Sequence, residues 1–209
     1  MPLDILHADD ALIVAVKPSD LLSVPGRGDD KQDCMAARVQ AAFPDALVVH
    51  RLDMATSGLI AFARGKGPQR TLSDAFAQRT VDKRYVAVVA GAMPSDTGAI
   101  DLPLSVDWPN RPRQQVDPAR GKPSLTRWRV LAHDPAAGTT RVALEPVTGR
   151  SHQLRVHLLA IGHPILGDAL YAPDAVRDAA PRLLLHAECL DLPHPFDGRR
   201  LAFTSSPTF

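Results

Sequence analysis

The sequence predicts an α+β fold, in which helices flank a sheet that is mixed or mostly antiparallel. Two observations lead to this prediction. Short apolar runs rich in β-branched residues outnumber the segments with helical spacing, and strands and helices do not alternate regularly, as they do in a parallel α/β fold. The chain has 209 residues, of which 45% are hydrophobic, and a chain of this length buries enough surface to fold without disulfide or metal support.

Seven apolar runs predict the strands of this sheet. They end at charged residues, prolines or glycines, which limit strands in sequence. Residues 133–139 lie between two of these runs and include Asp134 and Gly138, which predict a tight turn that joins the two strands. The predicted strands are residues 11–16, 47–49, 59–63, 85–90, 127–132, 140–144 and 183–192.

Three segments, residues 33–42, 68–77 and 151–161, have the spacing of helices. In the third, Leu154, Leu158 and Ile161 form an apolar stripe, Ser151 is a candidate N-cap, and Gly162 followed by Pro164 ends the helix. Between the predicted strands, residues 101–122 contain four prolines and predict a loop.

Several function classes find no support. No apolar run approaches the roughly 20 residues that cross a bilayer, and the first ten residues lack the pattern of a signal peptide, so we expect a cytoplasmic protein without a membrane partner. Cys34 and Cys189 lie far apart and are expected to be reduced thiols. The sequence lacks a phosphate-binding Gly-x-x-x-x-Gly-Lys loop and a Gly-x-Ser-x-Gly elbow.

The net charge of +1 conceals a strong segregation of charge. Residues 1–49 carry four basic and eight acidic side chains, whereas residues 50–90 carry seven basic and three acidic ones. Residues 107–129 carry six basic against two acidic side chains, together with Trp108 and Trp128. Basic segments with aromatic residues suit an RNA partner, because guanidinium groups pair with phosphate and stack on bases. The alternative from charge alone is a solvated basic face.

The segment 50–59 concentrates candidate catalytic groups between two predicted strands. It reads His-Arg-Leu-Asp-Met-Ala-Thr-Ser-Gly-Leu, with Asp53 as its only acid. A carboxylate in such a turn either performs chemistry or caps backbone N–H groups. Thr56, Ser57 and Gly58 are expected to shape the turn and aim Asp53, since glycine tolerates a positive φ.

This segment resembles the signature of the RluA family of pseudouridine synthases, His-Arg-Leu-Asp-x-x-Thr-Ser-Gly-Leu, at every fixed position. The resemblance continues through residues 83–88, 149–157 and 162–168, in the order of the family. It implies the pseudouridine synthase fold, isomerisation of uridine in RNA, and no cofactor or metal. Because His50 follows only 49 residues, we expect one catalytic domain over residues 1–209 without an S4 domain.

Residues 17–26, 107–112 and 121–123 look like the members of that family with dual specificity. This similarity implies uridine targets in 23S ribosomal RNA and in the tRNA anticodon stem-loop, with RNA and not DNA as the partner of a monomeric enzyme. A synthase with a different RNA target and a catalytically silent RNA-binding module are the alternatives. A hydrolase or lyase that uses Asp53 with a histidine would not require the basic segments.

The resemblance also implies roles for individual residues. Asp53 is the catalytic carboxylate, either as nucleophile at C1′ or as a base on a glycal route, with Tyr85 stacked on the uracil and Arg155 as the charge partner of Asp53. Taken alone, Tyr85 could be a core aromatic residue and Arg155 a phosphate ligand. Residues 111–129 form either an arm that grips RNA or a hairpin with exposed arginines. The expected substrate-binding residues are Arg51, which displaces the base, and His50, Thr56, Arg150, His152 and Leu154.

Overall fold

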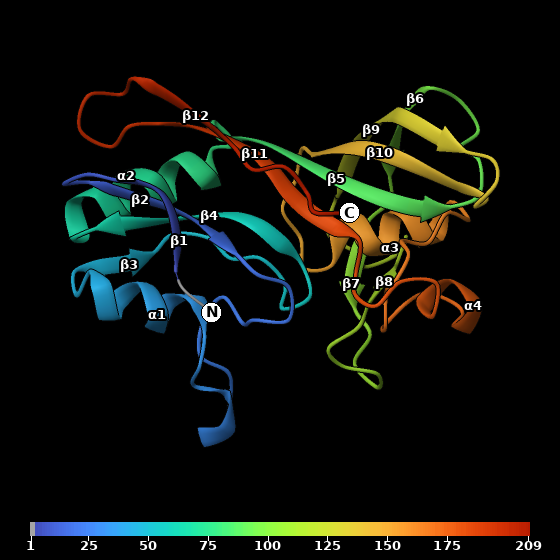
Figure 1. Ribbon diagram of the computed structural model, residues 1–209, viewed down its shortest axis with the longest axis horizontal. Helices are drawn as coiled ribbons and strands as arrows, with labels where there is room; N and C mark the ends of the chain where they lie inside the picture. The colour runs from blue at the N-terminus through green and yellow to red at the C-terminus, as the bar shows by residue number, and fades with distance from the viewer. Residues whose placement is uncertain (1–2) are drawn as a thin grey trace. The chain divides into compact units, whose positions relative to one another are not determined.

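The structure, a computed structural model, describes residues 3–209, and the chain divides into two compact units. Unit 1 comprises Met1–Lys83 and His186–Thr208, and unit 2 comprises Arg84–Leu185 and Phe209. Figure 1 shows a strand-rich architecture with few helices in each unit. Within residues 3–209, no helix is long and apolar enough to cross a membrane.

The sheet of unit 1 is mixed. Its strands run in the order β1-β2-β4-β11, with β12 paired to β11 and β3 paired to β4. The pairing of β11 with β4 is parallel, and the other pairs are antiparallel. The strands are β1 (Asp4–Ala8), β2 (Leu12–Lys17), β3 (Ala46–Val48), β4 (Ser57–Arg64), β11 (Leu185–Pro193) and β12 (Arg200–Thr204).

One face of this sheet forms the core with helix α2 (Lys66–Ala77). Alternate residues of β4, among them Leu59 and Ala61, point to the same face because side chains along a strand alternate in direction. They pack with Leu72 of α2, which is fully buried. Helix α1 (Met35–Ala42) packs beside β3, and the 3-10 turn η1 (Asp29–Lys31) precedes it. This packing fixes the start of β4, where the segment 50–58 enters the sheet.

The main sheet of unit 2 is antiparallel throughout, with the order β5-β10-β9-β6. A separate antiparallel pair, β7 with β8, forms a hairpin beside helix α3 (Figure 1). The elements are β5 (Asp82–Ala90), β6 (Thr97–Asp101), β7 (Leu104–Val106), β8 (Gln114–Val116), β9 (Leu125–Asp134), β10 (Thr139–Pro146), α3 (Gln153–Ala160) and α4 (Asp174–Arg177).

The structure confirms the predicted α+β class and corrects three details. The N-cap of α3 is His152 in a left-handed conformation with φ 55°, and it makes no side-chain cap hydrogen bond, so the prediction of Ser151 as N-cap was wrong. The proline-rich segment 101–122 is not one loop, since it contains β7 and β8. Trp128, which would contact RNA if residues 111–129 formed an RNA-gripping arm, is a core residue with 6% of its surface exposed, packed over Gly98.

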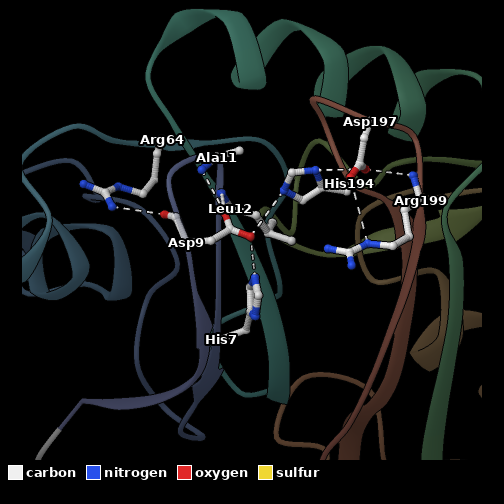
Figure 2. Close-up of polar contacts among 8 residues, drawn as sticks. All are labelled: His7, Asp9, Ala11, Leu12, Arg64, His194, Asp197 and Arg199. Carbon is white, nitrogen blue, oxygen red and sulfur yellow. Dashed lines mark hydrogen bonds and ion pairs between the residues drawn. The ribbon is translucent and has the colours of Figure 1, made fainter.

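A polar cluster ties two turns of unit 1 together (Figure 2). Asp9, in the turn between β1 and β2, accepts hydrogen bonds from the backbone N–H groups of Ala11 and Leu12. Its second carboxylate oxygen lies 2.7 Å from Nε2 of His7 and 3.2 Å from Nε2 of His194, which follows β11. Burial raises the pKa of Asp9, but these hydrogen bonds outweigh burial and hold the pKa at about 2.

Candidate active site

The segment that carries Asp53 is fixed by side chains from one neighbouring loop of unit 1. Ser23 donates a hydrogen bond to the carbonyl of Leu52 at 2.7 Å and accepts one from its N–H at 3.0 Å. Ser19 donates to the carbonyl of Ala55 at 2.8 Å. These bonds hold the backbone on both sides of Asp53, so the position of its carboxylate does not depend on the segment 52–56 alone.

Lys17 provides the third attachment and is fully buried. Its ammonium group donates to the carbonyls of Pro18, Leu21 and Met54, at 2.8, 2.7 and 2.8 Å. Three acceptors match the three N–H donors of an ammonium group. The lysine at the end of β2 therefore joins its own loop to the residue next to Asp53.

The charge of Lys17 also bears on this site. Burial lowers its pKa to about 8, while the carboxylates of Asp20 and Asp53 act in the opposite direction. At pH 7 the lysine is therefore mostly protonated. The buried ammonium group of Lys17 thus lies within electrostatic range of the carboxylate at the centre of the candidate site.

Asp53 itself is half-buried and lies in a turn that the N–H of Thr56 closes on the carbonyl of Asp53 at 3.1 Å. Arg51 and Met54 on either side are exposed. The turn thus presents a carboxylate and a guanidinium from alternate positions of one short segment, while the backbone beneath them is held.

His50 links the start of the segment to β4 and α2, and its ring is neutral. Its Nε2 accepts the N–H of Ala61 at 2.9 Å, and its ring stacks on Phe76 with 4.4 Å between centroids. Burial, and then the charge of Lys83, lower the pKa of His50 to about 3. Since Nε2 is an acceptor, the ring proton lies on Nδ1.

The end of the segment enters β4 by a close approach to β11. Gly58 has φ 113°, as expected for a glycine that allows a left-handed turn, and a side chain there would collide with the backbone of Ala187. Ser57 lies 2.9 Å from Nδ1 of His186, whose Nε2 is bound to the carbonyl of Ser205 at 3.0 Å. A carbonyl only accepts, so Nε2 carries the proton and Ser57 donates to Nδ1. Thr56 is also buried.

In unit 2, Tyr85 lies on β5, in register with Leu144 of β10, and is half-buried. The predicted strand 85–90 is confirmed, although β5 begins three residues earlier. Tyr85 is therefore held by a continuous antiparallel ladder, which restrains the backbone of an aromatic residue more firmly than a loop does.

Arg155, on α3, forms a buried ion pair with Asp168. Its Nε and Nη2 donate to the two carboxylate oxygens at 2.8 and 2.6 Å, and 3% and 1% of the two residues are exposed. Oδ1 of Asp168 also accepts the N–H groups of Leu170 and Tyr171. This bidentate pair fixes the plane of the guanidinium. The prediction that Arg155 is the charge partner of Asp53 stays a prediction.

Tyr171 connects the start of α3 with the β7–β8 hairpin. Its hydroxyl lies 2.6 Å from Nδ1 of His152 and accepts the N–H of Gln114 at 2.8 Å. The guanidinium carbon of Arg155 lies 5.0 Å from the centre of the Tyr171 ring. His152 and Arg155 are therefore oriented by the same aromatic residue.

Gln153 organises the loop before α3. Its side-chain oxygen accepts hydrogen bonds from the hydroxyl of Thr148 at 2.7 Å and the N–H of Arg150 at 3.1 Å. Arg150 is exposed, whereas Leu154 is buried in the helix. Of the residues predicted to bind substrate, Arg150 is thus available to a partner, and Leu154 contributes packing.

The structure groups the predicted residues in two sets. His50, Arg51, Asp53 and Thr56 share one segment of unit 1. Arg150, His152, Leu154 and Arg155 lie at the start of α3 in unit 2, where Tyr85 lies on β5. Among residues 3–209, no group of three or more His, Cys, Asp or Glu side chains is arranged to hold a metal ion.

Sequence reasoning missed Lys17, Asp168 and Tyr171. Lys17 had a recognisable signal, because a lysine that directly follows an apolar strand-like run and precedes proline is placed where a charge needs a partner. Asp168 lies within the family-like segment 162–168, but its partner Arg155 is 13 residues away in sequence. Tyr171 gave no signal in the sequence.

Comparisons with known proteins show the family to which the chain is similar. Residues 11–160 match the family "RNA pseudouridylate synthase". The Dual-specificity RNA pseudouridine synthase RluA of Escherichia coli (strain K12) is 51% identical over 205 residues, 98% of this chain and 93% of the relative. The protein of that description from Pasteurella multocida (strain Pm70) is 50% identical over 207 residues, 99% and 94% of the two chains.

Solved structures show the same fold. Human RNA Pseudouridylate Synthase Domain Containing 1 aligns with a TM-score of 0.82 and 30% identity, over 100% of this chain and 84% of the human one. Human RNA Pseudouridylate Synthase Domain Containing 4 aligns with a TM-score of 0.79 and 25% identity, over 98% of this chain and 89% of the human one. The predicted pseudouridine synthase fold is confirmed, and the chain belongs to the RNA pseudouridylate synthase family.

Proposed function

We propose that this protein isomerises uridine to pseudouridine in two kinds of RNA, 23S ribosomal RNA and the tRNA anticodon stem-loop. The observation that carries the proposal is the 51% identity over 98% of the chain to a dual-specificity RNA pseudouridine synthase. The motif at residues 50–59 and the basic segments 50–90 and 107–129 support it, because both are suited to an RNA substrate.

The reaction breaks the C1′–N1 bond, turns the uracil, and forms a C1′–C5 bond. The proton on C5 leaves to solvent and N1 gains a proton, so atoms and electrons balance without an oxidant or reductant. In this proposal Asp53 supplies the carboxylate, either by attack at C1′ or as the base on a glycal route. Its supports are the three attachments of the segment to Ser19, Ser23 and Lys17, since such preorganisation lowers the cost of reaching a reactive geometry.

The target base must leave the RNA stack, at a cost of a few kcal/mol. In the proposal, Arg51 enters the space that the base leaves, and its exposure supports that role. Tyr85 stacks on the extruded uracil, and Arg155 stabilises the ionised Asp53. The ion pair with Asp168 supports the role of Arg155, because it keeps the buried guanidinium of Arg155 in one orientation.

The other predicted residues act around this centre. Arg150 and His152 contact phosphates near the start of α3, where backbone N–H groups also favour an anion. His50, Thr56 and Leu154 hold the segments that carry Arg51, Asp53 and Arg155. Both units together act as one catalytic domain, and the protein works as a monomer in the cytoplasm.

The experiment uses the purified protein, without added metal or nucleotide, and two RNAs that carry C5-tritiated uridine. One is an unmodified tRNA and the other is a fragment of 23S ribosomal RNA. Release of tritium into water from both is the expected result. Release from neither RNA would overturn the proposal, and release from one would restrict it to that RNA.

A further inference from the structure

The hairpin of β7 and β8 carries an ordered tip, residues 107–113. Three backbone hydrogen bonds close it, from Asp107 N–H to the Arg113 carbonyl at 3.0 Å, from Asn110 N–H to the Asp107 carbonyl at 3.1 Å, and from Arg113 N–H to the Asn110 carbonyl at 3.0 Å. The side-chain amide of Asn110 also donates to the Asp107 carboxylate. The conformation of the tip is thus held by hydrogen bonds within residues 107–113.

An exposed tryptophan dominates this tip. Trp108 exposes 67% of its surface, although a tryptophan gains more from burial than almost any other side chain. The guanidinium carbon of Arg111 lies 4.4 Å from the centre of its ring, within the range of a cation–π contact. The fold of unit 2 does not use the apolar area of Trp108, in contrast to that of Trp128, which is 6% exposed.

The charges around Trp108 favour an anionic partner. On the tip itself, Arg111 is exposed and Arg113 is half-buried. At the base of the hairpin, Arg120 and Lys122 are exposed, and Lys122 is held beside β7 by two backbone hydrogen bonds with Leu104. The acids of this region are engaged locally. Asp107 accepts from Asn110, as described above, and Asp117 accepts from Ser105 and from the N–H groups of residues 119 and 120. Both carboxylates keep their charge in these hydrogen bonds, and Arg111 and Arg113 outnumber Asp107, so the tip carries a net charge of +1. Residues 114–122 carry a further +1, because Arg120 and Lys122 outnumber Asp117.

The base of the hairpin rests on the helix that carries proposed site residues. Leu104 packs with Val156 of α3 and with Tyr171 in a small core of their own. The hydroxyl of Tyr171 joins Gln114 of β8 to His152. Figure 1 shows β7 and β8 beside α3, with the connecting loops extending away from the larger sheet of unit 2. Whatever binds the tip is therefore held near the start of α3.

We propose that the tip binds an unpaired nucleotide of the substrate RNA other than the target uridine. The base stacks on Trp108, and the flanking phosphates accept hydrogen bonds from Arg111 and Arg113. This inference rests on the proposed function. A base presents a π-face whatever its identity, so stacking is tolerant of sequence. The tip therefore adds affinity for two different RNAs without requiring the same base in both.

The test compares Trp108→Ala with Trp108→Phe and with a matched control, Phe196→Ala. Phe196 is an aromatic residue in unit 1 that is 66% exposed, and it belongs to neither the site nor the tip. Stacking of one base is worth roughly 5- to 150-fold in affinity. We expect Trp108→Ala to raise KM for tritium release from both RNAs roughly 10-fold with little change in kcat, Trp108→Phe to restore most of the loss, and Phe196→Ala to match wild type.

A second measurement identifies the contact. Each loop nucleotide of a fluorescently labelled anticodon stem-loop is replaced in turn by an abasic one, and affinity is measured by anisotropy. At one position the abasic change should weaken wild type roughly 10-fold but leave Trp108→Ala unaffected, because the two changes remove the same stack. An unfolding temperature close to that of wild type would confirm that each variant is folded.

The outcomes separate this inference from the proposed function. If wild type releases tritium and Trp108→Ala matches it in KM and in anisotropy, the inference is overturned and the proposed function stands. If wild type releases none, the proposed function fails, and the anisotropy comparison still decides whether Trp108 binds RNA. An RNA affinity of Trp108→Ala equal to that of wild type would likewise overturn the inference.

Discussion

Lys17→Met tests whether one buried lysine holds the segment that carries Asp53. Methionine has a similar length but no donors, so the variant leaves the carbonyls of Pro18, Leu21 and Met54 without the bonds at 2.7–2.8 Å that they accept in wild type. Bonds to a charged donor contribute about 1.5–3 kcal/mol each. The variant no longer buries an ammonium group, which offsets part of this loss, and we expect the free energy of unfolding to fall by about 3 kcal/mol.

Thermal unfolding followed by circular dichroism measures this loss. For a chain of this size, 3 kcal/mol corresponds to a Tm lower by about 6–12 °C. Below that Tm, kcat for tritium release should fall roughly 10- to 100-fold, since small displacements of a catalytic group are costly. Lys66→Met is the control, because Lys66 is an exposed lysine of the same unit. If Lys17→Met matched wild type in both Tm and kcat, Lys17 would not hold this segment.

Three further predictions concern stability. Asp168→Asn should lower the free energy of unfolding by about 3 kcal/mol in urea titrations, because it removes the charge of the carboxylate that accepts two hydrogen bonds from the buried Arg155 guanidinium, whereas Asp178→Asn at the surface should cost less than about 1 kcal/mol. The pKa of His50 is lowered to about 3 in the folded state, so the unfolded state takes up the proton first as the pH falls. The free energy of unfolding should therefore decrease as the pH falls below about 6.5, and His50→Gln should reduce this pH dependence. An equal pH dependence in wild type and His50→Gln would contradict the burial of a neutral ring. For Asp9, with a pKa of about 2, the contribution to stability is complete above about pH 4 and is lost toward pH 2, so Asp9→Asn should remove an acid-range loss of roughly 1 kcal/mol, and an unchanged acid transition would count against the cluster.

The sequence predicted the buried strands and all three longer helices, because their apolar residues recur with a clear period. It missed β1, β6 and β12, in which exposed and partly buried residues alternate along most of each strand. Such strands have too few buried residues to be distinguished from loops by hydropathy. The strands β7 and β8 have three residues each within a proline-rich segment, and their pairing depends on contacts with α3.

The candidate site was predictable where its residues are close in sequence. The motif at 50–59 predicted a turn that carries Asp53, and the structure has this turn, with a positive φ at Gly58. The catalytic role of Asp53 stays a prediction. The sequence could indicate that Lys17 needs a partner, but it could not identify the partners of Ser19, Ser23 and Lys17, since these bonds link positions 29–37 residues apart. Ser151 failed as a cap because the left-handed His152 begins the helix and bonds to Tyr171 instead.

The Asp53 carboxylate performs the reaction in the proposed function. The most direct measurement is single-turnover tritium release from tRNA by wild type, Asp53→Asn and Asp20→Asn. Asp20 is a matched control because it also lies near Lys17, is exposed, and has a left-handed φ that asparagine tolerates. We expect wild-type release by Asp20→Asn and no release above background by folded Asp53→Asn. Release by Asp53→Asn at a rate comparable with wild type would contradict this expectation.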